Sequence, residues 1–525
     1  MASPCVIAGE SRVTPLDFSV FRFLAIDDMS SHRDLLKGML WQAGVRSIDL
    51  ACDGADAVNK ISKNEYDVIL CDYNLGEGQD GQQVLEEVMH RKLLSYNTIY
   101  VMITAENSSN MVRGAMEYSP DDYLIKPISK EILGHRVQRL LEKKQAMRGI
   151  YDATEAKQYA EAIVMCDDVI AKHKRLRQDL MKLKAELYCK SNNPVEARKV
   201  YQEAYDKKQY QWANLGLGRV SLQLKEYPQA RKLFKTLMVE NPDCLEAYDC
   251  LALAFEGEGD TKEAQRILGL AAKISPKALL RQRELGRVSL INDDADAAIA
   301  AFKQSIKLAR HSVFHSIEDY FGLVRAQLYK NDFSSAIAAL TNAKNDFKRD
   351  AKSGIRIEIM QCEIDFNCDR QDKAKLNWDS VKRMASAYKE PMTADLSEDL
   401  IRAAKLFQDN EIAEIAGLDS AVVKKQVSSE SKRYKKLNKE GIKLYSGGYL
   451  QEAIEKFEEA LKGMPDNTGV LLNYIQVLIA EAKELGLDAD EDKKIRRMLK
   501  KAKSIEPESE RCLSLIKAFN SLNKG

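Results

Sequence analysis

The first part of the chain alternates short apolar runs with longer amphipathic segments. The apolar runs are continuous, as in strands buried on both faces of a parallel sheet, and include RFLAI, VILC, IYVMIT and DYLI. The segments between them carry apolar residues at helical spacing, which predicts helices at residues 30–44, 54–64, 82–93, 111–119 and 129–144. Five strands alternating with five helices predict a doubly wound five-stranded parallel sheet, an α/β domain over residues 21–145. Residues 1–20, with two prolines, are expected to form a flexible N-terminal extension.

After residue 145 the apolar pattern is helical throughout and repeats itself. The segments PQARKLF, KEAQRIL and DAAIAAF place Ala230, Ala264 and Ala298 at intervals of 34 residues. The same interval separates Leu217-Gly218, Leu251-Ala252 and Leu285-Gly286, and also Pro242 and Pro276. One period recurring at three kinds of position favours a stacked repeat over a generic helical bundle.

The clearest unit, YDCLALAFEGEGDTKEAQRILGLAAKISP, resembles the tetratricopeptide (TPR) consensus. The resemblance implies an all-α TPR solenoid whose concave face binds a protein or peptide. Small residues would let paired helices approach, Gly259 would form the turn, and proline would end the second helix. The predicted packing positions are Gly218, Ala230, Phe234, Pro242, Ala252, Gly259, Ala264, Pro276, Gly286, Ala298, Ala453 and Pro465.

Less regular units extend the array on both sides. We expect TPR-like repeats over residues 146–390, with 38-residue intervals near Ala336 and Ala374 that imply longer helices or turns. Residues 391–440 predict a degenerate repeat and a basic linker, and residues 441–525 predict a final TPR unit followed by capping helices. The junction at residues 139–159 is expected to be helical throughout and therefore stiff.

Polar residues stand where the predicted strands of the α/β domain end. Asp27 and Asp28 follow the first strand, Asp72 ends VILCD, Thr104 ends the next run, and Lys126 follows DYLI. The carboxyl ends of parallel strands meet at one crevice, which is where ligands bind in open α/β sheets. Three carboxylates, a hydroxyl and a lysine suit a magnesium ion and a phosphoryl group.

These residues resemble the motif of the receiver domain of two-component response regulators, and the resemblance covers about residues 22–144. It implies a flavodoxin-like strand order, with Asp72 as phosphoacceptor, Lys126 as the conserved lysine, and Thr104 and Tyr123 as the switch pair. It also implies a Mg²⁺ site formed by Asp28, Asp72 and the backbone carbonyl of Asn74, with Asp27 either a ligand or a hydrogen-bond partner of metal-bound water.

The loop after Asp72 departs from the family pattern. NLGEGQDG is one residue longer than usual and has Gly76 where proline is typical. Asn74 and Glu106 occupy the positions that set the lifetime of the aspartyl phosphate. They resemble those of the chemotaxis receiver, so we expect fast decay of the phosphate here as well.

Composition excludes several other classes of function. The formal net charge of +1 leaves no overall footprint for nucleic acid, and the lysine-rich stretch around residues 424–439 is better explained as a solvated helical face or linker. No apolar run approaches the length of a membrane span, and the cysteines are scattered without a signal peptide, so a cytoplasmic protein with reduced thiols is expected. The resemblance to the receiver family implies a bacterial origin.

The sequence therefore predicts a response regulator rather than an enzyme, with only phosphoryl acceptance and self-dephosphorylation at the receiver. A sensor histidine kinase or phosphotransfer protein would phosphorylate Asp72, and the repeats would bind a protein under receiver control, with receiver pairing in a homodimer as another output. Two alternatives stay open: a phosphate sink or decoy with a constitutive TPR scaffold, and a hidden phosphatase activity in the helical part.

Overall fold

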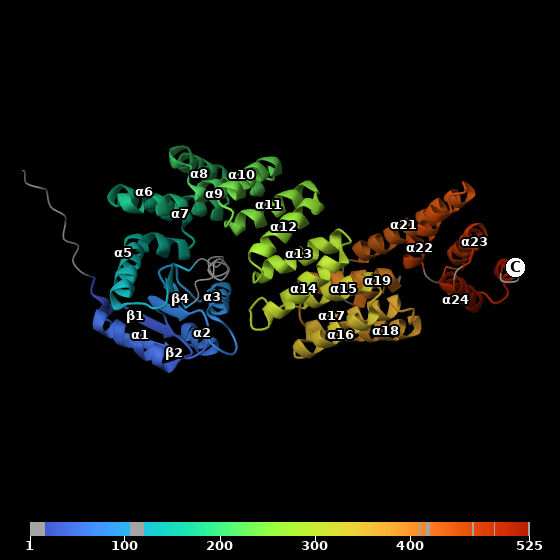
Figure 1. The fold of residues 1–525 in the computed structure, drawn as a ribbon, viewed down its shortest axis with the longest axis horizontal. Helices are drawn as coiled ribbons and strands as arrows, with labels where there is room; N and C mark the ends of the chain where they lie inside the picture. Colours follow the sequence, from blue (N-terminus) through green and yellow to red (C-terminus); the bar gives the residue numbers. More distant parts are fainter. Residues whose placement is uncertain are drawn as a thin grey trace, which may run out of the picture. The chain divides into compact units, whose positions relative to one another are not determined.

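The computed structural model describes residues 16–105, 120–407, 409, 411–415, 420–464, 467–487 and 489–522. The chain forms two units, residues 1–336 and 337–525 (Figure 1). The predicted helix at residues 111–119 and the predicted roles of Glu106 and Pro465 lie outside the described residues.

The N-terminal domain contains a five-stranded parallel sheet with strand order β2-β1-β3-β4-β5, as the resemblance implied. Its strands are β1 (Arg22–Ile26), β2 (Ser47–Ala51), β3 (Val68–Asp72), β4 (Ile99–Thr104) and β5 (Asp122–Ile125). Strand β3 pairs with β1 on one side and β4 on the other, so it occupies the centre of the sheet. All five of its residues are buried, which explains its continuous apolar run.

Helices cover both faces of this sheet, which confirms the doubly wound prediction. On one face, α1 (Ser30–Ala43) and α5 (Lys130–Glu155) pack through Leu40 and Leu133 against alternate residues of β1, β3 and β4. On the other, α2 (Gly54–Lys63) and α3 (Gly81–His90) pack through Ile61 and Val84.

Helix α5 belongs to both parts of the chain. Leu133 packs against the sheet, whereas Met147 and Ile150 pack against α6 (Tyr159–Lys172). The helix therefore continues through residue 145 and serves as the first helix of the repeat array. The uninterrupted helix predicted for residues 139–159 was wrong at one point: α5 ends at Glu155, because the hairpin turn to α6 puts Lys157 in a left-handed conformation with φ of 60°.

The rest of the described chain is helical and antiparallel, as predicted. In the first unit the further elements are η2 (Lys174–Leu176), α7 (Arg177–Lys190), α8 (Pro194–Lys208), α9 (Gln211–Gln223), α10 (Tyr227–Glu240), α11 (Leu245–Glu258), α12 (Thr261–Ile274), α13 (Leu279–Ile291), α14 (Ala295–Ala309) and α15 (Ile317–Tyr329). Helix α16 (Phe333–Asp346) spans the boundary. The second unit continues with α17 (Ala351–Asn367), α18 (Gln371–Ala387), α19 (Ala394–Phe407), α20 (Ile412–Ile415), α21 (Ser420–Ser446), α22 (Leu450–Gly463), α23 (Thr468–Leu485), α24 (Ala489–Ile505) and α25 (Glu510–Leu522).

The hairpin turns follow the period predicted from the sequence. Each of seven turns contains a residue with positive φ, at intervals of 33 to 38 residues: Lys157, Asn192, Lys225, Gly259, Asp293, Asn331 and Asp369. Gly259 ends α11 in the left-handed conformation with φ of 83°, as expected of a turn glycine. The two longest intervals surround Asn331, which agrees with the predicted 38-residue units.

A glycine in the first helix of a pair faces an aromatic ring in the second helix, 16 residues later in the sequence. A Cβ atom at Gly218 would overlap the Phe234 ring, and one at Gly286 would lie 2.9 Å from the Phe302 ring. Gly441 and Phe457 repeat the arrangement in the second unit. Ala230, Ala264, Ala298 and Ala453 are each fully buried, Ala252 nearly so, and Pro242 and Pro276 come just after α10 and α12 end. The predicted packing positions thus lie where the helices touch.

The lysine-rich segment forms part of a repeat. Helix α21 runs through the predicted boundary at residue 440, and its Arg433 pairs with Glu459 of α22 at 2.5 Å. Among the described residues, no helix is both long and apolar enough to cross a membrane. The cysteines in the described part of the chain are free thiols.

Candidate functional site

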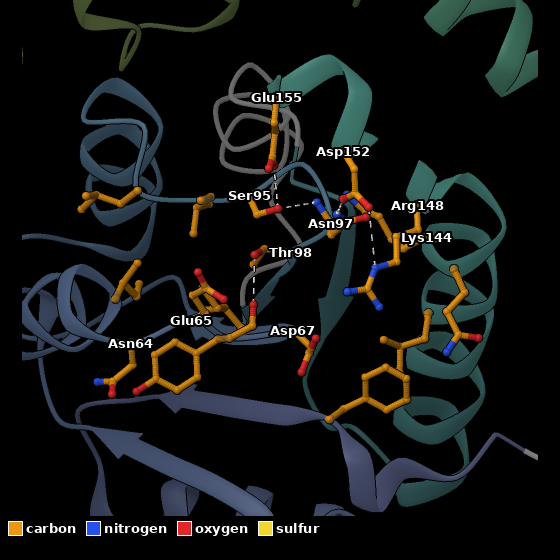
Figure 2. A pocket seen from close by; sticks show the side chains of 18 residues that line it. Asn64, Glu65, Asp67, Ser95, Asn97, Thr98, Lys144, Arg148, Asp152 and Glu155 are labelled. Carbon is orange, nitrogen blue, oxygen red and sulfur yellow. Dashed lines mark hydrogen bonds and ion pairs between the residues drawn. The ribbon is translucent and has the colours of Figure 1, made fainter. Parts of the chain in front are cut away.

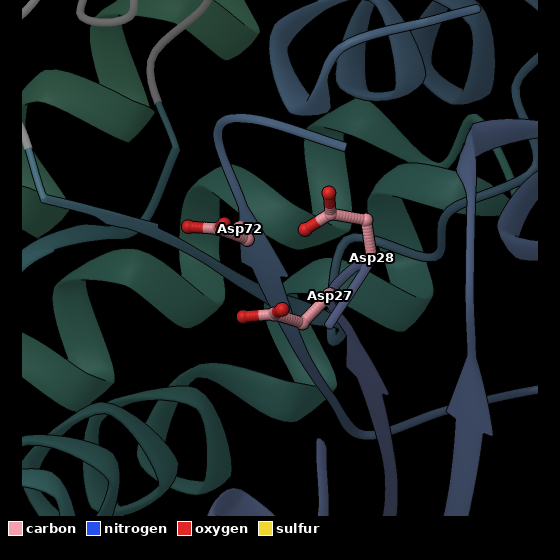
Figure 3. Close-up of side chains that lie close together, drawn as sticks. All are labelled: Asp27, Asp28 and Asp72. Atoms are coloured by element: carbon pink, nitrogen blue, oxygen red, sulfur yellow. The ribbon is translucent and has the colours of Figure 1, made fainter. Parts of the chain in front are cut away.

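Three carboxylates meet at the carboxyl end of the sheet (Figure 3). Asp72 is the last residue of β3, and Asp27 and Asp28 follow the neighbouring strand β1. One oxygen from each lies within 4.8 Å of the others. Asp27 and Asp72 are buried while Asp28 is exposed, so the cluster opens to solvent on one side.

Lys126 extends into this cluster from the end of β5. Its Nζ lies 2.9 Å from Asp27 Oδ2 and 3.1 Å from Asp72 Oδ1. Burial lowers the pKa of Lys126, but the hydrogen bond to Asp27 and the charge of Asp72 outweigh burial, so the pKa lies above its usual value. The lysine is therefore held in its charged form between the two carboxylates.

The phosphoacceptor candidate carries an electrostatic cost. Burial raises the pKa of Asp72, and the nearby charge of Asp27 adds to that rise, while Lys126 opposes it. A second cation beside Asp28 would lower the free energy of the ionised cluster further. Two buried carboxylates and one exposed carboxylate are a donor set that suits a hard divalent ion.

Thr104 and Tyr123 lie on the adjoining strands β4 and β5, and Tyr123 lies two positions further from the carboxyl edge than Thr104. Thr104 ends β4, is buried, and accepts a hydrogen bond through its carbonyl from the Lys126 backbone N–H at 2.6 Å. Tyr123 is half-buried in β5, opposite Met102. The switching roles of both residues stay predictions.

The loop after Asp72 shows why glycine replaces the typical proline. Gly76 has φ of 74°, a left-handed conformation closed to proline, and a Cβ there would lie 3.2 Å from Asp28 Oδ2. Asn74 is exposed, and its Oδ1 accepts a hydrogen bond from the Gly76 N–H at 3.4 Å. The metal role of the Asn74 carbonyl and the role of Asn74 in phosphate lifetime stay predictions.

Two residues of α1 that contact the acidic pair were not predicted from the sequence. Arg33 donates from Nη1 to the carbonyl oxygens of Asp27 and Asp28 at 2.7 and 2.9 Å. His32 Nδ1 lies 3.3 Å from Lys126 Nζ and 3.4 Å from Asp27 Oδ2. The signal was present, since SSHRD is separated from the acid pair by one residue and starts a helix that returns His32 and Arg33 to the strand end.

A pocket of about 510 Å³ lies at the opposite, amino edge of the sheet (Figure 2). The loop before β4 forms one wall and is fastened to the second half of α5. Ser95 Oγ and the Tyr96 N–H donate to Glu155 Oε1, both at 2.7 Å, and Asn97 Nδ2 donates to Asp152 at 2.8 Å. These hydrogen bonds join the loop before β4 to the first repeat helix, so the pocket lies at a joint between the sheet and α5, and Asn97 Oδ1 is buried there without a hydrogen-bond partner among the described residues.

Comparison with known proteins agrees with the sheet domain and with part of the helical region. The family model of the response regulator receiver domain matches residues 23–138, and a tetratricopeptide repeat model matches residues 193–254. The chemotaxis protein CheY-3 of Vibrio cholerae is 25% identical over 122 residues, which cover 23% of this chain and 92% of the relative. The chemotaxis protein CheY of Pseudomonas aeruginosa is also 25% identical over 122 residues, covering 23% of this chain and 97% of its own.

Among solved structures, chemotaxis protein CheY4 of Vibrio cholerae is 29% identical, with a TM-score of 0.22, and the match covers 23% of this chain and 98% of that one. The family models, with the parallel sheet and the paired helices, support one conclusion about the chain as a whole. It combines an N-terminal response regulator receiver domain with a region of tetratricopeptide repeats.

Proposed function

We propose that this chain is a phosphorylation-controlled adaptor, in which Asp72 accepts a phosphoryl group and the repeats bind a partner protein. The observation that carries the proposal is the convergence of Asp72, Asp28 and Lys126 at one edge of the sheet. An Asp72 oxygen would attack the phosphorus atom of a phosphohistidine on a kinase or phosphotransfer protein. The P–N bond would break, and its electron pair would stay on the imidazole, which takes up a proton.

Each residue of the site has a separate part in this transfer. Lys126, already 3.1 Å from Asp72 Oδ1, would place its charge beside the transferred oxygens. Asp27 would hold that lysine in place through its 2.9 Å contact. Asp28 and Asp72 would hold Mg²⁺, with the Asn74 carbonyl as a further ligand. The ion would neutralise charge that develops on the phosphoryl oxygens.

The exposed carboxylate Asp28 gives the most direct test of the metal. The change Asp28→Asn removes a charged ligand but keeps the side-chain shape, so we expect Mg²⁺ affinity to fall by at least about tenfold. Isothermal titration of the full chain with MgCl₂ measures this effect. The change Asp53→Asn, at the end of the neighbouring strand β2, should leave the affinity unchanged. Equal affinities for all three proteins would contradict the metal assignment.

The repeats would supply the output without a reaction of their own. Ion pairs connect the first helices of neighbouring repeats. Arg281 of α13 donates two hydrogen bonds of 2.7 Å to Asp249 of α11. Arg287 of α13 donates to Glu256 of α11 at 2.6 and 2.8 Å. On the same helices Leu253 and Leu280 stay 53% and 42% exposed. Exposed leucines on helices that ion pairs hold together can bind the apolar side chains of a protein ligand. We therefore place partner binding on α11 and α13.

Capture of partners from the native cell tests the adaptor. The baits would be the wild-type chain, Asp72→Ala and Leu253→Asp, each with and without acetyl phosphate. We expect a specific protein whose yield changes with acetyl phosphate on the wild-type bait, does not respond to it on Asp72→Ala, and drops severalfold on Leu253→Asp.

A partner captured equally by wild type and Asp72→Ala in both conditions would overturn receiver control and favour the phosphate sink. Turnover of a phosphorylated substrate by the full chain would instead favour the hidden phosphatase.

A further inference from the structure

Helix α3 of the receiver has a buried polar stripe. Its apolar residues Val84, Leu85 and Val88 face the sheet. Gln82 and Glu86, one turn apart, carry polar side chains and yet are only 7% and 4% exposed. Gln82 Nε2 donates to Glu86 Oε1 at 3.2 Å. Buried polar side chains need hydrogen-bond partners. Gln82 and Glu86 lie on the face of α3 that points away from the receiver core, so a segment outside the receiver must cover them.

The loop between α14 and α15 supplies that cover. Ser312, itself 7% exposed, donates from Oγ to Glu86 Oε2 at 3.0 Å across 226 residues of sequence. Gln83 Nε2 donates to the Leu308 carbonyl at 3.3 Å. The His90 ring meets the Phe314 ring edge to face, with ring centroids 5.3 Å apart. Three successive turns of α3 thus contact residues 308–314.

The same loop contains the irregularity found in the sequence. Residues 310–316 connect α14 to α15, whereas only residues 275–278 connect α12 to α13. Part of the extra length of this 38-residue unit therefore lies in the segment that reaches the receiver. The repeat spacing alone gave no reason for a longer loop, and its contact with α3 gives one.

The other end of α3 lies directly against the phosphoacceptor. The Gly81 N–H donates to the Tyr73 carbonyl at 2.8 Å, and a Cβ at Gly81 would overlap the Asp72 carbonyl oxygen. Asp80 and Gln83 form a capping box at this end. The Gln83 side chain therefore contacts both the cap residue Asp80 and the Leu308 carbonyl. Because Gly81 packs against the Asp72 carbonyl, a shift of the Asp72 backbone would move the first turn of α3.

The loop is also anchored on the side of the repeats. Arg283 of α13 donates to the Phe314 carbonyl at 2.7 Å and binds Asp319 of α15 through two contacts of 2.7 and 2.9 Å. Asp319 is fully buried. Arg283 lies on the same helix as Arg281 and Arg287, which brace α13 against α11. The loop thus connects α3 to the helices on which partner binding is placed.

We propose that residues 308–316, the end of α14 and the loop that follows it, form an internal docking site for receiver helix α3, and that phosphorylation of Asp72 releases α3 from it. This inference rests on the proposed function, because it assigns the route by which the same site controls the repeats. In the docked state the receiver restrains α13 and α15 through Arg283, and release frees them to adjust to a partner.

Hydrogen exchange of the full chain tests the docking. The reporters are loop amides hydrogen-bonded within the loop: Ser312 N–H to the Ala309 carbonyl, Phe314 N–H to Ser312 Oγ and His315 N–H to the Ser312 carbonyl. With Mg²⁺ and acetyl phosphate we expect peptides covering residues 308–316 to exchange at least fivefold faster, while the intact mass rises by one phosphoryl group. The Glu86→Ala/His90→Ala variant removes the α3 partners of Ser312 and Phe314 and leaves the hydrogen bonds within the loop intact, so these peptides should exchange fast without phosphorylation. The exposed change His311→Ala should behave as wild type.

The outcomes separate the two proposals. If Asp72 is phosphorylated and exchange at residues 308–316 does not change, the inference is wrong and the proposed function stands. If no phosphoryl group is taken up, the proposed function fails and release by phosphorylation fails with it. Slow exchange in the unphosphorylated Glu86→Ala/His90→Ala variant, equal to that of wild type, would overturn the docking itself.

Discussion

A chain carrying Asp72→Asn takes up phosphoryl groups from acetyl phosphate at least about a thousandfold more slowly than wild type, because the amide lacks the anionic oxygen that attacks phosphorus. The substitution is nearly isosteric, and it removes a carboxylate whose pKa burial raises, so the fold is expected to persist. Intact-mass spectrometry of both proteins with Mg²⁺ over a time course measures the loss.

The change Asp53→Asn is the matched control. Asp53 follows β2 at the same edge of the sheet, and its side chain caps α2 by accepting from the Asp56 N–H at 2.8 Å. Asparagine caps a helix about as well as aspartate, so uptake should equal that of wild type. Phosphoryl uptake by Asp72→Asn at the wild-type rate would show that another residue is the acceptor, whereas equal loss in both variants would indicate a damaged fold.

The receiver was predictable because local and global signals agree in it. A run such as VILC can be buried on both faces only in a covered parallel sheet, and the acid that ends it marks the edge where strand ends converge. Asp27, Asp72 and Lys126 accordingly meet as expected. His32 and Arg33 were missed although the start of α1 was predicted, because a helix start alone does not show which side chains of the first turn reach back to the strand end.

The repeat period was predictable, but most of its turns were not. Gly259 is the turn glycine that the sequence predicted, and its φ is positive; Gly448 also has positive φ in a hairpin of the second unit. The other hairpins place lysine, asparagine or aspartate in the left-handed conformation, as at Lys225 and Asp293. Asparagine and aspartate tolerate this conformation, but they are common elsewhere, and lysine gives no signal at all.

Contacts between distant segments could not be predicted from the sequence. Ser312 and Glu86 are separated by 226 residues, and neither belongs to a motif. The double use of α5 was hidden for a related reason, since its helical periodicity continues unchanged from the receiver side at Leu133 to the repeat side at Ile150. A helical pattern shows that a face is buried and does not show which domain buries it.

Loss of the Phe234 ring is expected to destabilise the repeats more than any surface change. The side chain is fully buried between α9 and α10, with Gly218 directly against its ring. The change Phe234→Ala leaves a cavity that neighbouring helices fill only in part, which costs about 3–5 kcal/mol. Urea unfolding followed by circular dichroism measures the loss, and Val239→Ala on the same helix, at an 83% exposed position, should cost less than about 0.5 kcal/mol.

A double-mutant cycle separates lost packing from general damage to the helix. Gly218→Ala alone should cost about 1–3 kcal/mol, because its Cβ overlaps the Phe234 ring and overpacks the contact. In the Phe234→Ala background the same methyl group enters the cavity, so its cost should fall to near zero or change sign. If the free-energy costs of the two changes simply add, Gly218 and the Phe234 ring do not touch in solution. The recurrence of this pair at Gly286 and Phe302 could then not be explained by packing of glycine against the ring.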